Sequence, residues 1–137
     1  MATTTDIATE QAENNIIPVK LAANQVVYAG TMVAVDSATG FGLPANDTTA
    51  DCKVQGVAVE FADATGKANG EAIVLVRRNR QFKFKNAGAA AACGQTELFE
   101  EVYSVDNETV GKTTTQSNVA GRLMQIDTDG VWVQIPA

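Results

Sequence analysis

The sequence predicts an all-β fold, a compact β-barrel or β-sandwich of short antiparallel strands with an extended N-terminal arm. First, the chain from residue 16 onward is a series of short β-branched runs, which is typical of strands. Second, the runs are separated by segments that combine Asp, Ser or Thr with a final Gly, as in 37–40, 63–66 and 127–130. Third, the main helix candidate, the alanine run 87–92, is too short to be stable by itself, so we expect a helical turn or a loop there.

The first segment, residues 1–15, differs from the rest of the chain. It is polar, Thr-rich and acidic, and its isolated Ile7 cannot bury enough apolar area to offset the entropy of ordering. We expect a flexible arm that a neighbouring subunit holds in place. The remaining residues, 16–137, are expected to form a single β domain, since a chain of 137 residues has the length of one domain.

Eight strands are expected within that domain. Their ranges are 16–20, 26–28, 32–36, 54–61, 71–85, 101–105, 122–127 and 131–135. The last two suit a hairpin, in which Met124 and Ile126 share the core with the valines and Ile135 of the opposite strand. Trp132 falls on the face opposite those valines, where it packs either in a second layer or at a subunit contact.

Composition limits the function. The formal charge of −6 argues against a nucleic-acid partner, because phosphate binding needs a positive field. Histidine is absent, which removes the commonest general base and the commonest metal ligand. Cys52 and Cys93 are interpreted as small buried apolar residues, with a disulfide as the alternative. No apolar run approaches the roughly 20 residues of a membrane span or resembles a signal peptide, so we expect no membrane partner and a cytoplasmic location at first.

Two short motifs resemble parts of ligand-binding loops, but the residues at the remaining positions of those loops do not match. The stretch ETVGKTTT ends like a nucleotide-binding loop, but the required upstream glycine is replaced by Asp106, and the residues that follow are poor helix formers. A polar hairpin loop between strands explains it better. The segment 127–130, DTDG, resembles a calcium loop, yet Gln125 and Pro136 stand where acidic ligands are needed. We therefore expect no cofactor and no metal.

The strongest charge feature is a basic stretch that contains five of the ten Lys and Arg residues: Arg77, Arg78, Arg80, Lys83 and Lys85. Strand alternation puts the two lysines on one face and the interleaved phenylalanines on the other. The stretch therefore fits three interpretations: a plain surface strand, a binding surface for an acidic protein, or a binding site for single-stranded nucleic acid. An acidic stretch, with Glu97, Glu100, Glu101, Asp106 and Glu108, could pair with it across strands or head-to-tail between copies.

The chain also repeats itself faintly. The segments 54–57 (VQGV) and 119–122 (VAGR) each place Val-x-Gly before a run that ends at an acidic turn. This fits two similar β-units and equally a coincidence. No nucleophile stands beside a recognisable base, so the sequence gives no active site and we expect no enzyme.

Three features together resemble a known family. They are VVYAGTMVAVDSATG at 26–40, VQGVAVEFAD with the following EAIVLV, and VYSVDNETV with VAGRLMQIDTDGVWVQI near the end. Over about residues 16–136 the chain resembles the capsid cement, or head decoration, proteins of tailed bacteriophages, a group sometimes mislabelled as RecA/RadA-like recombinases. The likeness rests on the pattern of strands and turns.

The resemblance implies a structural virion protein, often trimeric, that binds the outer surface of the expanded capsid and stabilises it. Its partners would be the major capsid protein and itself, and before assembly it would lie in the host cytoplasm. The family offers no catalytic residue. The expected protein contacts are Ile7, Arg77, Arg78, Arg80, Lys83, Lys85 and Trp132. A tail tube or baseplate subunit and a carbohydrate-binding or adhesion module, which would need exposed aromatic residues on one face, remain the alternatives.

Overall fold

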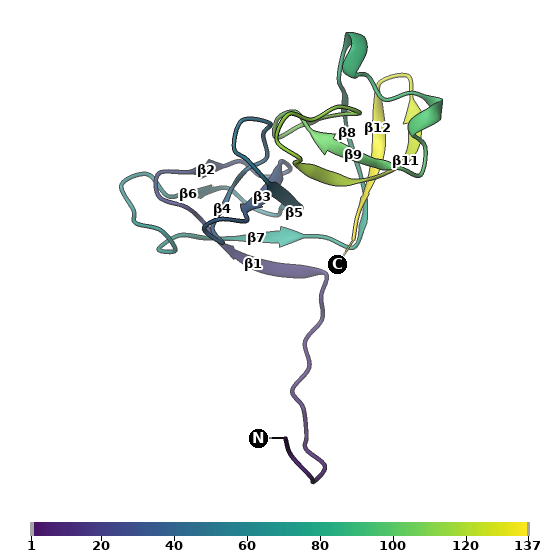
Figure 1. Cartoon of the computed structure of the whole chain (residues 1–137). Coiled ribbons are helices and arrows are strands. Elements are labelled where there is room, and N and C mark those ends of the chain that lie inside the picture. Colours follow the sequence, from purple (N-terminus) through teal and green to yellow (C-terminus); the bar gives the residue numbers. More distant parts are fainter. Residues whose placement is uncertain (1, 137) are drawn as a thin grey trace.

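A computed structural model describes residues 2–136 and confirms the all-β prediction (Figure 1). The strands of the first half are β1 (Ile16–Lys20), β2 (Val26–Val27), β3 (Met32–Asp36), β4 (Gly42–Pro44), β5 (Cys52–Ala58), β6 (Ala62–Asp63) and β7 (Ile73–Arg77). Those of the second half are β8 (Arg80–Asn86), β9 (Glu101–Ser104), β10 (Thr109–Gly111), β11 (Val119–Asp127) and β12 (Gly130–Ile135). The alanine run contains a single 3-10 turn, Ala89–Ala91, as expected, and a second lies at Gln95–Glu97.

The strands form two five-stranded units and one small ribbon. In the first half, β1-β7-β5-β3-β4 make an antiparallel sheet, hereafter the sheet, and β2 pairs with β6 beside it. In the second half, β8, β12, β11, β9 and β10 make a closed barrel, hereafter the barrel. The sheet also curls toward closure, because a parallel bridge joins Leu21, just after β1, to Gly42 in β4. Figure 1 shows the two units side by side, with the arm extending away from β1.

The two units have the same topology. The order β1-β7-β5-β3-β4 of the sheet matches the order β8-β12-β11-β9-β10 of the barrel, strand for strand. The corresponding neighbours are antiparallel in both units. The closing contact is parallel in both, between Leu21 and Gly42 in the sheet and between β8 and β10 in the barrel. The faint sequence repeat therefore marks a repeat of structure.

The Val-x-Gly pair lies at equivalent places in the two units. Gly56 of β5 pairs with Val33 of β3, and Gly121 of β11 pairs with Val102 of β9. Next to each glycine the ladder carries one extra residue, Gln55 in β5 and Ala120 in β11. Such a bulge bends a strand, and strong bending is what closing a five-stranded unit requires.

The core has two parts. One fills the barrel and continues onto the outer faces of β3, β4 and β5, where Met32 and Ala34 contribute. The other lies between the sheet and the β2–β6 ribbon and contains Val33, Val74 and Val76. Adjacent residues of β3 thus enter different cores, because side chains alternate across a strand. This arrangement joins the two units into one body and leaves the outer side of β1 and β7 uncovered.

Several predicted boundaries were wrong. The run 71–85 is two strands, because the chain turns at Asn79, whose φ of 63° is a left-handed conformation that asparagine tolerates. The short strands β4, β6 and β10 were missed. The final hairpin exists, but a register shift near Met124 leaves that residue half-buried and puts Leu123 in the core instead.

Candidate interaction surfaces

The arm makes no contact that would hold it against the fold over residues 2–13. These residues are exposed, and their hydrogen bonds with other described residues are local ones between Thr3 and Thr5. Ile7 is 70% exposed. The arm becomes fixed only at Asn14 and Asn15, through bonds from the side chain of Arg78 to the Asn14 carbonyl and amide oxygens and from Asn79 to the Asn15 amide oxygen (3.0 Å).

The predicted basic stretch is divided between two places. Arg78 anchors the arm, and Arg77 ends β7 in the sheet. Arg80, Lys83 and Lys85 follow in β8 of the barrel and are exposed there. The predicted alternation is confirmed, since Phe84 is buried and Phe82 packs against the same core, on the face opposite the two exposed lysines.

Both lysines of β8 are occupied by acidic neighbours. The Lys83 ammonium lies 2.7 Å from Asp129 and 3.7 Å from Asp127, and Lys85 lies 2.9 Å from Glu108. The hydrogen bond to Asp129 raises the pKa of Lys83, and the one to Glu108 raises that of Lys85. The expected pairing of the basic with the acidic stretch occurs within the chain for Lys85 and Glu108 alone, since the partners of Lys83 lie in the 127–130 turn, outside that acidic stretch. Both lysine charges are balanced by carboxylates of the same chain.

Trp132 stands on the same face as these lysines. It pairs with Lys83 across the ladder, and its indole N–H donates to the carboxylate of Asp127 at 2.8 Å. The side chain is half-buried, on the face opposite Val131 and Val133, as predicted. Its polar atom is therefore already bonded within the chain.

The structure adds an apolar surface that the sequence analysis missed. On the outer side of β1 and β7, Pro18 pairs with Leu75, and beside them the Val59 N–H donates to the Leu75 carbonyl oxygen at 2.9 Å. The exposed residues Ile16, Pro18, Val59, Ile73 and Leu75 form this surface, hereafter the apolar wall. The aromatic pair Tyr28 and Phe61, with ring centroids 5.5 Å apart, is also exposed on the sheet half.

The equivalent wall of the barrel has a different character. Strand β8 takes the place of β1 and β12 that of β7, so Lys83 stands where the sheet has Pro18 and Trp132 where it has Leu75. One wall is thus charged and internally paired, whereas the other is apolar. Since the same topology is built with either surface, folding alone does not require the exposed apolar residues, and contiguous patches of this kind mark interaction sites.

A cleft of about 720 Å³ lies between the two units. Its lining includes Lys53 and Gln55 from β5, Gly121 and Arg122 from β11, and the exposed Phe99. The lining is of mixed charge and holds no nucleophile beside a base. Among residues 2–136 no group of three or more His, Cys, Asp or Glu side chains is placed to hold a metal ion.

The GKTTT segment is organised by a carboxylate of the chain itself. Asp47 accepts hydrogen bonds from the Thr114 hydroxyl (3.0 Å) and from the backbone N–H groups of Thr115 and Gln116 (both 3.2 Å). The groups that an anion would need are therefore engaged. The segment connects β10 to β11, which do not pair with each other, so the predicted loop is present but is not a hairpin.

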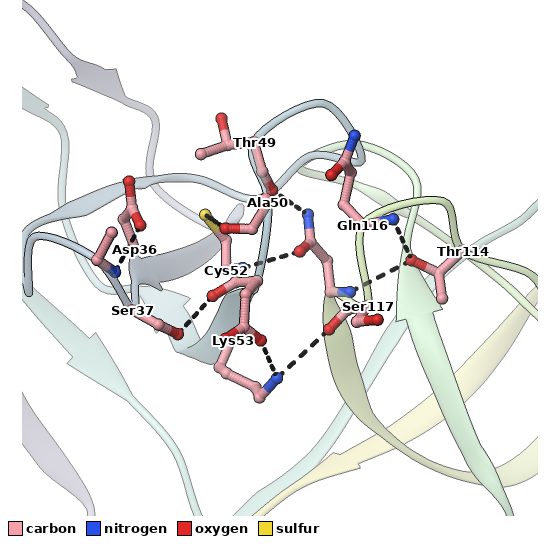
Figure 2. A network of polar contacts seen from close by, with 12 residues as sticks. Asp36, Ser37, Thr49, Ala50, Cys52, Lys53, Thr114, Gln116 and Ser117 are labelled. Carbon is pink, nitrogen blue, oxygen red and sulfur yellow. Dashed lines mark hydrogen bonds and ion pairs between the residues drawn. The ribbon is translucent and has the colours of Figure 1, made fainter.

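The same segment closes around a buried asparagine. The Asn118 amide accepts from the Cys52 N–H (2.8 Å) and donates to the carbonyls of Asn46 (2.7 Å) and Thr49 (2.9 Å). Figure 2 shows how Thr114 accepts from Gln116 beside it, while Lys53 reaches across to Ser117. This network ties the loop before β5 to the loop before β11, which are equivalent loops of the two units.

Both cysteines are buried and free, as the first of the two sequence interpretations held. Burial raises the pKa of the Cys93 thiol to about 11 and also raises that of Cys52. Such thiols react slowly, because the thiolate is the nucleophile.

Comparison with protein-family models, with curated proteins and with solved structures gives no match for this chain. Within residues 2–136, no helix has the length and apolar character to cross a bilayer.

Proposed function

We propose that this chain is a structural, non-enzymatic virion protein that binds the outer surface of the expanded capsid of a tailed bacteriophage and stabilises it. It would act as a homotrimer, take the major capsid protein as its partner, and need no cofactor and no direct contact with nucleic acid. The proposal starts from the resemblance of its strand-and-turn pattern to the capsid cement proteins.

The observation that carries the proposal is the arm, which makes no contact with its own fold over residues 2–13. An arm of this kind orders by binding another protein. Many copies on one shell would then reinforce it by multivalent attachment.

The test is co-sedimentation of the purified protein with undecorated, expanded heads, with unexpanded heads as the control. Saturable binding to expanded heads alone supports the proposal, because shell expansion would create the site. Binding to neither, with a monodisperse protein left in solution, would contradict it.

Variants locate the binding surface. Removing residues 1–15 should leave a folded domain that binds expanded heads poorly, and full occupancy by the truncated protein would exclude the arm from the binding surface.

The double change Arg78→Glu and Arg80→Glu should weaken binding in a salt-dependent way. Its matched control is Lys67→Glu with Lys112→Glu, which alters the net charge equally at two exposed positions. Equal binding by both double variants at low salt would remove the basic stretch from the surface.

One observation favours the adhesion alternative. Tyr28 and Phe61 are 58% and 55% exposed, and exposed aromatic rings are what a carbohydrate-binding surface uses. Their planes are tilted by 49°, however, so the two rings do not form a flat platform for one sugar ring. Binding to a glycan array that is lost in Tyr28→Ala would move the assignment to that class.

A further inference from the structure

The apolar wall is flanked by cationic side chains. In the β1–β7 register, Ile16 pairs with Arg77 and Ile73 pairs with Lys20, so a positive charge lies at each end of the wall. No ion pair with another described residue involves either Arg77 or Lys20. The partner that fits this surface carries an apolar group beside uncompensated negative charge.

The barrel half carries such a group at Phe99, which is 56% exposed. The two residues that follow it, Glu100 and Glu101, are exposed and make no ion pair with a described residue. These three residues are hereafter the acidic knob. The Phe99 backbone is fixed from both sides, since its N–H donates to Leu123 (2.7 Å) and its carbonyl accepts from the Arg122 side chain (2.6 Å).

The position of Phe99 is unusual for its residue type. Its φ is 67°, a left-handed conformation that is uncommon for a bulky side chain. An exposed aromatic residue in such a conformation adds nothing to the core. Held rigidly, it has the properties of an interface anchor, because little conformational entropy is lost when it docks.

We propose that copies of this chain associate head-to-tail, with the acidic knob of one copy packed on the apolar wall of the next. The charges select this arrangement over the symmetric ones. Wall against wall would bring Lys20 and Arg77 of two copies together, and knob against knob would bring their glutamates together. A head-to-tail contact pairs opposite charges, and contacts of this type build a ring when the rotation between copies closes and an open filament when it does not. The inference does not depend on binding to a capsid.

The test uses two variants and a control, measured by sedimentation velocity over a range of protein concentrations. Phe99→Asn removes the aromatic ring but keeps a residue that tolerates positive φ. Leu75→Lys adds a third positive charge to the wall. Val105→Lys is the control, because Val105 and Leu75 are both 39% exposed and only Leu75 lies in the wall. We expect the wild type and the control to associate, and each of the other two to bind itself at least roughly tenfold more weakly.

Mixing the two variants gives the decisive result. The Leu75→Lys chain keeps an intact knob and the Phe99→Asn chain keeps an intact wall, so the mixture should form a 1:1 dimer that grows no further. Association should also weaken as salt rises, since exposed charges contribute to it. Phe99→Gly and Ile73→Lys replace either variant if circular dichroism shows it to be unfolded.

Three outcomes would overturn the proposal. These are a wild type that stays monomeric at every concentration, a Phe99→Asn chain that assembles normally, and a mixture of the two variants that yields no dimer. Normal assembly of Phe99→Asn together with failure of Leu75→Lys would specify a wall-to-wall contact instead. Sedimentation with capsids is a separate experiment, so failure of either proposal leaves the other distinguishable.

Discussion

Replacing Gly121 by alanine should destabilise the protein strongly, although only one methyl group is added. The new Cβ would lie 2.3 Å from the carbonyl oxygen of Gln134 and 2.9 Å from Cγ1 of Val133. A carbonyl oxygen in a strand ladder cannot rotate away, so β11 and β12 must move apart. The equivalent Gly56 faces the same obstacle, since its Cβ would lie 2.3 Å from the carbonyl oxygen of Arg77.

The magnitude follows from the cost of overpacking, which is about 1–3 kcal/mol. Because the obstacle is backbone, we expect the upper half of that range, roughly 2–3 kcal/mol, for each substitution. The reduced freedom of the unfolded chain offsets about 0.4–1 kcal/mol of it. For a domain of this size the net loss of stability, after this offset is subtracted, corresponds to a fall in Tm of roughly 4–12 °C.

The assay is calorimetry together with urea unfolding, in which the midpoint should fall while the m value stays constant. Gly88→Ala is the matched control, because a Cβ there meets nothing within 4 Å and the φ of −92° suits any residue. The control should be unchanged or slightly stabilised. A Tm for Gly121→Ala within about 1 °C of the wild type would refute the close approach of β11 to β12.

Two further substitutions address polar contacts. Asn118→Ala should cost about 2–4 kcal/mol, because it leaves the buried Cys52 N–H and the Thr49 carbonyl without partners and removes one of the two hydrogen bonds to the Asn46 carbonyl. Asn107→Ala, whose side chain makes no hydrogen bond with a described residue, should cost far less in the same urea titration. The second is Asp127→Asn, with Asp6→Asn on the arm as the control. Hydrogen bonds from Gln125 and Trp132 hold the pKa of Asp127 below its usual value, so the carboxylate stabilises the fold above about pH 4 and less as the pH falls through the folded-state pKa. The Tm of Asp127→Asn should therefore lie below that of the wild type at pH 7, and the difference should shrink at pH 3. Unfolding can be followed by the fluorescence of the single tryptophan, Trp132. An equal difference in Tm at pH 7 and pH 3 would show that the charge of Asp127 is not the cause.

Local chemistry made much of the fold predictable. The Asp, Ser, Thr and Gly turns were located correctly because the side chains of such residues bond their own backbone: the Asp36 carboxylate, for example, accepts from the Ala38 N–H at 2.9 Å. Closure was not predictable. It depends on the pairing of Leu21 with Gly42 and of β8 with β10, which joins residues far apart in sequence. In each unit one of the two closing strands, β4 or β10, has three residues and is too short to show alternation.

The interaction surfaces were likewise predictable only in part. The basic stretch was visible as charge, but the Asp129 and Glu108 that neutralise Lys83 and Lys85 are brought there by the turn after β11 and by the start of β10. The apolar wall was hidden, because the run IVLV in β7 is apolar on both faces and reads as a buried strand. Pro18 lacks an N–H and so indicates an edge strand, but an edge position does not tell which face of the sheet is exposed.

The repeated topology separates what folding requires from what binding requires. Features present in both units, namely the Val-x-Gly bulge, the parallel closing contact and the valine-rich interior, are the ones that close each unit. Features present in only one unit are free to serve contacts. The apolar wall, the ribbon of β2 and β6 and the arm belong to the first unit, whereas the paired lysines, Trp132 and Phe99 belong to the second. Because like units carry unlike surfaces, a second copy meets an apolar face with a basic rim on one side and an aromatic, acidic face on the other, which is the asymmetry that a head-to-tail assembly needs.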